Sequence, residues 1–200
     1  MLFMIAAALG RRDTYTHAHA QRVASYSRRL AIRARLSGDI LHDITLGGML
    51  HDVGKLALSD NIFSNKQAAL SQEMLGEVHS HPLIGAALLR HIHCSTNISN
   101  AVLLHHERIN GSGYPFGLQG NEIPLGAKIV SVADCFDAIT TDRPYQRRKT
   151  CKHAFAILEE MADTYLDGEL VVLMIEEIEA NGMEPIMPGL SIAEIYPALQ

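Results

Sequence analysis

The chain has 200 residues, 48% of them hydrophobic, and a net charge of −5 at neutral pH, which suits one globular domain with a sizeable core. Charges of both signs are interspersed, so there is no basic field for a nucleic-acid polymer and no polybasic tract for a membrane surface. Three widely spaced cysteines argue against a disulfide framework and fit a reducing, cytoplasmic location. Eleven histidines are the compositional oddity that remains to be explained.

The chain starts with an apolar, helical pattern over residues 1–10, which breaks at Arg11-Arg12-Asp13. The apolar stretch is too short to span a bilayer, and it lacks the charged beginning of a signal peptide. We interpret residues 1–12 as the end of an upstream linker helix, in a longer parent protein that would carry a sensor before this domain.

The rest of the chain predicts helices separated by short breaks. Apolar residues recur at spacings of three and four, while Ser71 and Pro82 mark helix starts. We expect helices over residues 16–36, 40–50, 60–64, 71–79, 82–92, 98–106, 124–140, 151–164 and 167–181. No run alternates with a period of two residues, so the predicted fold class is all-α, in one domain.

Two loops interrupt this helical pattern. The first, residues 107–123, contains the turn formers Asn110-Gly111-Ser112-Gly113-Tyr114-Pro115. The second, residues 141–150, is polar and basic, and within it Arg143 stands next to Pro144-Tyr145. We expect the first loop to be functional, and Arg143 is the strongest candidate in the second.

The segment Gly48–Lys55 stands out because His51 and Asp52 lie side by side at the end of an apolar helical run. Aspartate is rarely fully buried unless it is paired or bound to a metal. A neutral imidazole and a carboxylate suit a first-row transition metal, and one carboxylate can bridge two ions. Lys55, one turn further on, could meet a phosphate beside those ions.

Further candidate ligands lie on separate predicted helices. Asp134 sits inside an otherwise apolar helix, where a carboxylate needs a partner. The other candidates are imidazoles at helix starts, ends or faces: His19, His81, His105 and His106. With His51 and Asp52 they make five imidazoles and two carboxylates, which is about what a site of two metal ions needs. Paired ions activate a water molecule and hold a phosphoryl group.

The remaining candidates have ordinary alternatives. Asp137 lies one turn after Asp134 on the same helix face, where it either contacts the site or substrate or faces solvent. Five other histidines are expected to be surface residues, solvated or bonded to a partner: His42, His79, His91, His93 and His153. His17 is two residues from His19, so it is expected to point to another side of the helix. The cysteines are expected to be inert thiols.

Taken in chain order, these motifs are familiar. They are Asp13-Thr14-Tyr15-Thr16-x-x-His19 with Arg22-Val23, His51-Asp52-x-Gly54-Lys55, His81-Pro82-x-x-Gly85, His105-His106-Glu107-Arg108, Gly111-x-Gly113-Tyr114-Pro115, Asp134-x-x-Asp137-Ala138 and Asp142-Arg143-Pro144-Tyr145. Together, over residues 11–182, they resemble the HD-GYP family, a branch of the HD metal-dependent phosphohydrolases.

The resemblance implies a helical bundle around a binuclear metal site, extended by C-terminal helices and an irregular Gly-Tyr-Pro loop. It implies one output domain over residues 1–200, in which residues 183–200 form a C-terminal extension. The implied activity is a phosphodiesterase that hydrolyses the bacterial second messenger cyclic di-GMP to pGpG or GMP. Two divalent ions, iron or manganese, would be the cofactors.

The resemblance also assigns roles to individual positions. Its metal ligands would be His19, His51, Asp52, His81, His105, His106 and Asp134. Asp52 would bridge the ions, and His51, Asp52 and Lys55 would form the catalytic group. The residues facing the substrate would be Lys55, Tyr114, Pro115, Asp137 and Arg143.

Three positions depart from the family pattern. Tyr15 stands where members with a third metal carry a glutamate, so we expect two ions. Asn110 replaces an aspartate that usually follows His-His-Glu-Arg, and Gln146 stands where a basic residue often contacts substrate. These departures leave all the candidate ligands in place, but they bear on the substrate.

Two alternatives therefore stay open. One is an HD-type hydrolase acting on another cyclic dinucleotide or another phosphate ester. The other is a non-catalytic module that binds cyclic di-GMP or docks a GGDEF-type cyclase through the Gly-Tyr-Pro loop. A GGDEF-domain or upstream-sensor partner and a homodimer are further hypotheses.

Overall fold

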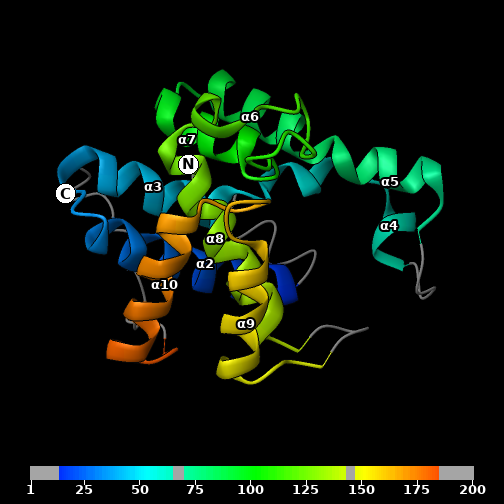
Figure 1. The fold of residues 1–200 in the computed structure, drawn as a ribbon. Coiled ribbons are helices and arrows are strands. Elements are labelled where there is room, and N and C mark those ends of the chain that lie inside the picture. Colours follow the sequence, from blue (N-terminus) through cyan, green and yellow to red (C-terminus); the bar gives the residue numbers. More distant parts are fainter. Residues whose placement is uncertain (1–13, 65–69, 143–146, 185–200) are drawn as a thin grey trace.

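The computed structural model describes residues 14–64, 70–142 and 147–184 (Figure 1). Its elements are α2 (Thr14–Arg33), α3 (Gly38–Leu50), η1 (Val53–Ala57), α4 (Asp60–Ser64), α5 (Gln72–His79), α6 (His81–His91), α7 (Thr96–Leu104), η2 (Gly120–Glu122), α8 (Leu125–Thr140), α9 (Cys151–Met161) and α10 (Gly168–Asn181). Within these ranges there are two isolated bridges and no strand, so the all-α prediction is confirmed.

Helix ends differ most from the prediction where the backbone turns left-handed. The helix expected over residues 16–36 ends at Arg33, because Arg35 has a φ of 61° and Leu36 donates back to the carbonyl of Ala31. The helix expected to reach residue 164 ends at Met161, shortly before Asp163 at a φ of 56°. Apolar periodicity runs past both ends since Leu36 and Ala162 still pack on the core.

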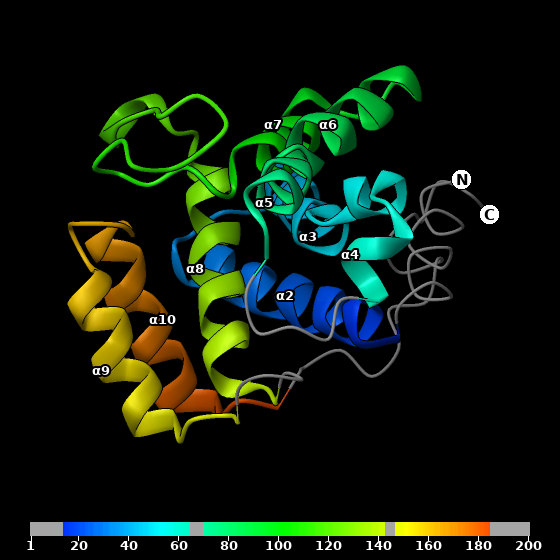
Figure 2. The same ribbon diagram turned by 90° about the vertical axis from the view of Figure 1, so that its right-hand side faces the viewer.

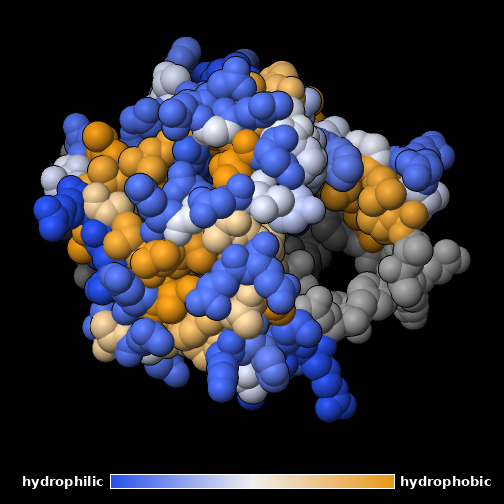
Figure 3. Space-filling model, viewed as in Figure 1, coloured by the Kyte–Doolittle hydropathy of each residue, from blue (hydrophilic) through white to orange (hydrophobic). Residues whose placement is uncertain are grey.

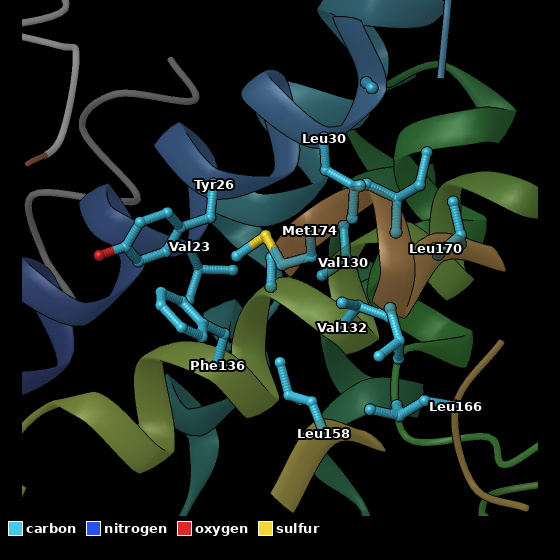
Figure 4. Close-up of a cluster of buried hydrophobic side chains, with 14 of the residues drawn as sticks. Val23, Tyr26, Leu30, Val130, Val132, Phe136, Leu158, Leu166, Leu170 and Met174 are labelled. Carbon is cyan, nitrogen blue, oxygen red and sulfur yellow. The ribbon is translucent and has the colours of Figure 1, made fainter. Parts of the chain in front are cut away.

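The main core forms around α8, which lies between two groups of helices. Figure 2 shows α9 and α10 along one side of α8, with α2 and α3 on the other. The close-up in Figure 4 shows side chains from α2, α8, α9 and α10 converging on one cluster, among them Tyr26, Phe136, Leu158 and Met174. Nearly every turn of α8 is buried, so its position is fixed from both sides.

A second cluster joins α3, η1, α6 and α7, with Leu50, Val53, Leu89 and Val102 at its centre. Here η1 approaches α6 so closely that Gly54 lies against backbone atoms of the first turn. A Cβ at Gly54 would overlap the carbonyl oxygen of His81 and lie 2.7 Å from the nitrogen of Gly85. The two glycines of the His51-Asp52 and His81-Pro82 motifs therefore meet, which brings the two histidines together.

The end of α10 is fastened to α2. The Arg29 guanidinium pairs with Glu177 at 3.0 Å and donates to the carbonyls of Gly182 and Glu184 at 2.8 and 3.1 Å. The Tyr26 hydroxyl donates to the carbonyl of Met183 at 2.9 Å. The chain just after α10 therefore follows α2.

The surface carries hydrophobic residues in patches broken up by hydrophilic ones (Figure 3). The helices described here include none that combines the length and hydrophobicity of a bilayer span.

We predict that Gly54→Ala lowers the free energy of unfolding by about 3 kcal/mol, because the new Cβ must displace the backbone at His81. Urea denaturation followed by circular dichroism measures this loss. The matched control is Gly76→Ala in the middle of α5, where a Cβ meets no atom within 4 Å. That change should stabilise the protein by about 0.5–1 kcal/mol, because alanine is the better helix former. Equal effects of the two substitutions would contradict the close approach of η1 and α6.

Candidate metal centre

The predicted ligands come from five places in the fold and converge on one buried pocket. His19 lies on α2, Asp52 follows α3, and Asp134 lies on α8. Two groups of side chains have ligand atoms within 4.8 Å of one another, one of them His19, His51 and Asp52, the other His81, His105 and His106. Asp134 joins the first group, since its Oδ1 lies 3.2 Å from the Nε2 of His19.

Three of the histidines make the same kind of hydrogen bond, from Nδ1 to a backbone carbonyl near the end of a helix. The last carbonyls of an α-helix have no partner within the helix. His51, just after α3, donates its Nδ1–H to the carbonyl of Gly48 at 2.8 Å. His81, which follows the end of α5, donates to Val78 at 2.6 Å, and His105, just after α7, donates to Val102 at 2.8 Å. Each bond fixes the tautomer whose Nε2 carries a lone pair.

Two of these three Nε2 atoms have no hydrogen-bond partner among the described residues. Those of His81 and His105 are buried and make no hydrogen bond to any described residue. Burial lowers the pKa of His81 to about 4 and that of His105 well below its usual value, so both rings are neutral at pH 7. Buried polar atoms normally have a partner, and neutral imidazole is a transition-metal ligand. The donor set therefore fits a metal ion.

Asp52 occupies the centre of the pocket. Its Oδ1 lies 3.3 Å from the Nε2 of His81, whereas its Oδ2 lies 3.4 Å from the Nε2 of His51 and 2.6 Å from the Nζ of Lys55. Burial alone would raise the pKa of Asp52, but Lys55 and His51 outweigh it and hold the pKa well below the usual range. The carboxylate is thus ionised and faces both groups of imidazoles, the position that a bridging ligand requires.

His19 is oriented by a carboxylate instead of a helix carbonyl. Its Nδ1 donates to Asp137 at 2.7 Å, and Asp137 also accepts from Arg22 at 2.6 and 3.1 Å. Burial would lower the pKa of His19, but the bonds to Asp134 and Asp137 raise it to about 9. A metal ion would therefore have to replace a proton on its Nε2.

Asp137 was expected at the substrate face, and the structure places it elsewhere. Its side chain has an exposed fraction of 0% and lies behind His19, between that ring and Arg22. The prediction of a substrate contact is corrected accordingly: this carboxylate orients a neighbouring imidazole. The sequence signal for this role is Arg22, which lies one helical turn after His19 and pairs with Asp137. The motifs contain all three residues but do not explain how they are arranged.

The loop over residues 107–123 is fixed to the pocket by Glu107. This buried carboxylate accepts from the amides of Phe116 and Leu118 at 2.7 and 3.0 Å. Gly113 lies directly on the backbone of residues 106–108, where a Cβ would overlap Arg108 and come within 2.5 Å of the His106 carbonyl oxygen. The Tyr114 ring consequently lies on the His106 ring, with centroids 4.6 Å apart.

The other predicted substrate contacts stay predictions. Lys55 is half-buried beside Asp52, and Pro115 is half-buried next to Tyr114. Arg143 and Gln146 lie outside the described residues, and so does the side chain of Tyr15. Sequence reasoning gave no role to Glu107. Its place directly after two consecutive histidines was a signal that could have pointed to one.

We predict that Asp137→Asn lowers metal affinity by about 10–100-fold, the usual scale for losing the partner of a metal-bound imidazole. An amide that donates to Nδ1 of His19 would move the imidazole proton to Nε2, where the metal should bind. Titration of the metal-free protein with Mn²⁺, followed by calorimetry, measures the effect. Asp142→Asn is the control, since its side chain is 67% exposed. Unchanged affinity in Asp137→Asn would contradict the orienting role.

We predict that Glu107→Gln loosens the loop over residues 107–123 and leaves the metal content unchanged. The amide keeps one acceptor, so the N–H of Phe116 or Leu118 loses its partner at a cost of about 1–3 kcal/mol. Faster hydrogen exchange at these two amides is the expected result. Unaltered exchange, or loss of metal, would count against this account of the loop.

Relatives with similar sequences include two cyclic di-GMP phosphodiesterases and one 3'3'-cGAMP-specific phosphodiesterase. A cyclic di-GMP phosphodiesterase of Pseudomonas aeruginosa is 41% identical over 138 residues, covering 68% of this chain and 33% of the relative. A cyclic di-GMP phosphodiesterase of Thermotoga maritima is 36% identical, covering 80% and 44%. The 3'3'-cGAMP-specific phosphodiesterase 3 of Vibrio cholerae is 32% identical, covering 79% and 34%. The chain thus spans between a third and just under a half of the length of these relatives.

The fold has solved counterparts as well. Bd1817, an HDG"Y"P protein from Bdellovibrio bacteriovorus, superimposes with a TM-score of 0.65 and 25% identity, covering 82% of this chain and 52% of the other. The family model described as HD domain matches residues 4–170. These matches agree with the order of the motifs and with the helical bundle. The chain therefore belongs to the HD domain family, in its HD-GYP branch.

Proposed function

We propose that this chain is a metal-dependent phosphodiesterase that hydrolyses cyclic di-GMP to pGpG or GMP. The observation that carries the proposal is the convergence of two groups of imidazoles on a buried, ionised Asp52 that also contacts Lys55. The family membership and the names of the relatives from Pseudomonas and Thermotoga support the reaction and the substrate.

The proposed ligands of two divalent ions, iron or manganese, are His19, His51, Asp52, His81, His105, His106 and Asp134. Such ions supply Lewis-acid charge and lower the pKa of bound water, which gives a nucleophile at neutral pH. The residues present fit this role, because Asp52 is ionised and the Nε2 atoms of His81 and His105 lack hydrogen bonds to the described residues.

Lys55 is the proposed cation for the phosphate. Its side chain is 29% exposed, so it contacts the buried Asp52 and is also accessible from solvent. There an ammonium group can offset the charge that grows on phosphate oxygens during attack. Tyr114 adds a neutral donor, since burial, followed by Asp52 and Asp134, raises the pKa of its hydroxyl above the usual value. Arg143 is the proposed contact to a second phosphate or a guanine edge.

The domain organisation, the partners and the cellular location are proposals as well. One output domain over residues 1–200 would work under an upstream sensor or beside a GGDEF-domain partner, as a monomer or a homodimer. A cytoplasmic location is proposed because the three cysteines, Cys94, Cys135 and Cys151, are widely spaced and odd in number.

The decisive experiment is anaerobic purification with metal analysis, followed by incubation with cyclic di-GMP and chromatography of the products. We predict that Asp52→Ala abolishes hydrolysis and strips the metal, because the central carboxylate is lost. Lys55→Ala should retain the metal and lower kcat by roughly 10²–10³, the scale for losing one charge-stabilising donor. The exposed Lys152→Ala is the control and should match the wild type. Full turnover in Asp52→Ala would overturn the proposal.

A second candidate substrate is another cyclic dinucleotide. The Vibrio relative is named for 3'3'-cGAMP, and Gln146 departs from the basic residue usual in the family. Competition between equal amounts of cyclic di-GMP and 3'3'-cGAMP decides the point: the substrate with the higher kcat/KM disappears first.

A further inference from the structure

Tyr114 lies between two imidazoles. Its ring is stacked on His106 with centroids 4.6 Å apart and planes 25° apart, and on His79 with centroids 4.1 Å and planes 21° apart. Two rings stacked this closely on Tyr114 would collide if they shared one of its faces, so Tyr114 lies between His79 and His106. The three rings form a column that runs from a proposed metal ligand to the surface.

This column changes which ring a nucleobase can use. A base stacks on an open aromatic face, but both faces of Tyr114 are already covered by imidazoles. His79 is the outermost ring, and its side chain is exposed. The open face of the column therefore belongs to His79, which the sequence suggested was an ordinary surface residue.

The position of His79 is fixed by residues close to it in the chain and by the contact of its helix with Ser59. His79 is the last residue of α5, a helix without buried residues that projects from the bundle together with α4 (Figure 1). Glu77 ties this helix to Ser59, accepting from its amide and, at 3.0 Å, from its hydroxyl. The next residues carry His81 into the metal pocket. His79 is thus held in place within two residues of a proposed ligand, although its own ring remains accessible.

We propose that His79 is a specificity-determining residue whose outer face stacks on a purine base of the substrate. The inference rests on the proposed function, because it places a phosphate of the cyclic dinucleotide at the metal centre and one of its two bases at the far end of the column. Imidazole rings are among the side chains on which proteins stack unpaired bases.

The kinetic test compares substitutions at position 79. His79→Ala should raise KM for cyclic di-GMP about tenfold, the low end for losing one base–aromatic stack, with kcat within twofold and metal content unchanged. His79→Phe should restore KM, because a phenyl ring also stacks. His91→Ala, an exposed histidine at the end of α6, is the matched control. A fall in kcat at constant KM would overturn the proposal, since it would mean that His79 only holds the Tyr114 ring in position and does not contact the base.

A second test does not depend on turnover. The chain contains no tryptophan, so His79→Trp introduces one indole as the only fluorophore of its kind. GMP should quench its emission in a saturable way, and UMP, with a smaller base, should quench it less. His91→Trp should respond to neither nucleotide. Equal quenching at positions 79 and 91 would overturn the proposal.

The two hypotheses fail separately. If wild-type protein with its metal hydrolyses no cyclic di-GMP, the proposed function fails, while the GMP titration still reports on the stacking face. If hydrolysis proceeds and His79→Ala has wild-type KM, the role of His79 is excluded and the proposed function stands.

Discussion

The hydrogen bond from an imidazole Nδ1 to an unpaired carbonyl at a helix end is the interaction on which the pocket depends. It occurs at His51, His81 and His105, on three different helix ends. Each bond satisfies a carbonyl that the helix leaves without a partner and turns the lone pair of Nε2 inward. The helix termini therefore orient the proposed ligands before any ion binds.

This arrangement requires the helix ends to meet, and small residues allow it. The contact between Gly54 and the first turn of α6 leaves no room for a Cβ, so it sets the distance between Asp52 and His81. Gly113 does the same where the loop crosses the end of α7. A buried polar centre gains little stability by itself, and it persists because the apolar clusters around α8 and α3 hold these backbones in place.

Much of the fold and the pocket followed from sequence patterns, because helical periodicity and paired motifs are local signals. The convergence of the motifs was inferred from a resemblance, since spacing alone does not say which helix ends meet. The sequence left open whether Asp137 contacts the site, the substrate or solvent, because one turn of helix does not say which neighbour a side chain packs against; only the packing shows that it contacts His19. His79 was overlooked because its role depends on a ring 35 positions later, at Tyr114. Contacts of this range leave no periodic trace.

The anchoring of residues 182–184 on α2 has a mechanical consequence. Helix α2 carries His19 and Arg22 near its beginning. Further along it carries Arg29, which binds the end of α10. A tilt of α2 would move the His19 Nε2 relative to the His51 Nε2, which lies 3.2 Å away. The proposed metal centre and the anchor of the end of α10 therefore share one helix, so the spacing of His19 and His51 is tied to the packing of residues 182–184.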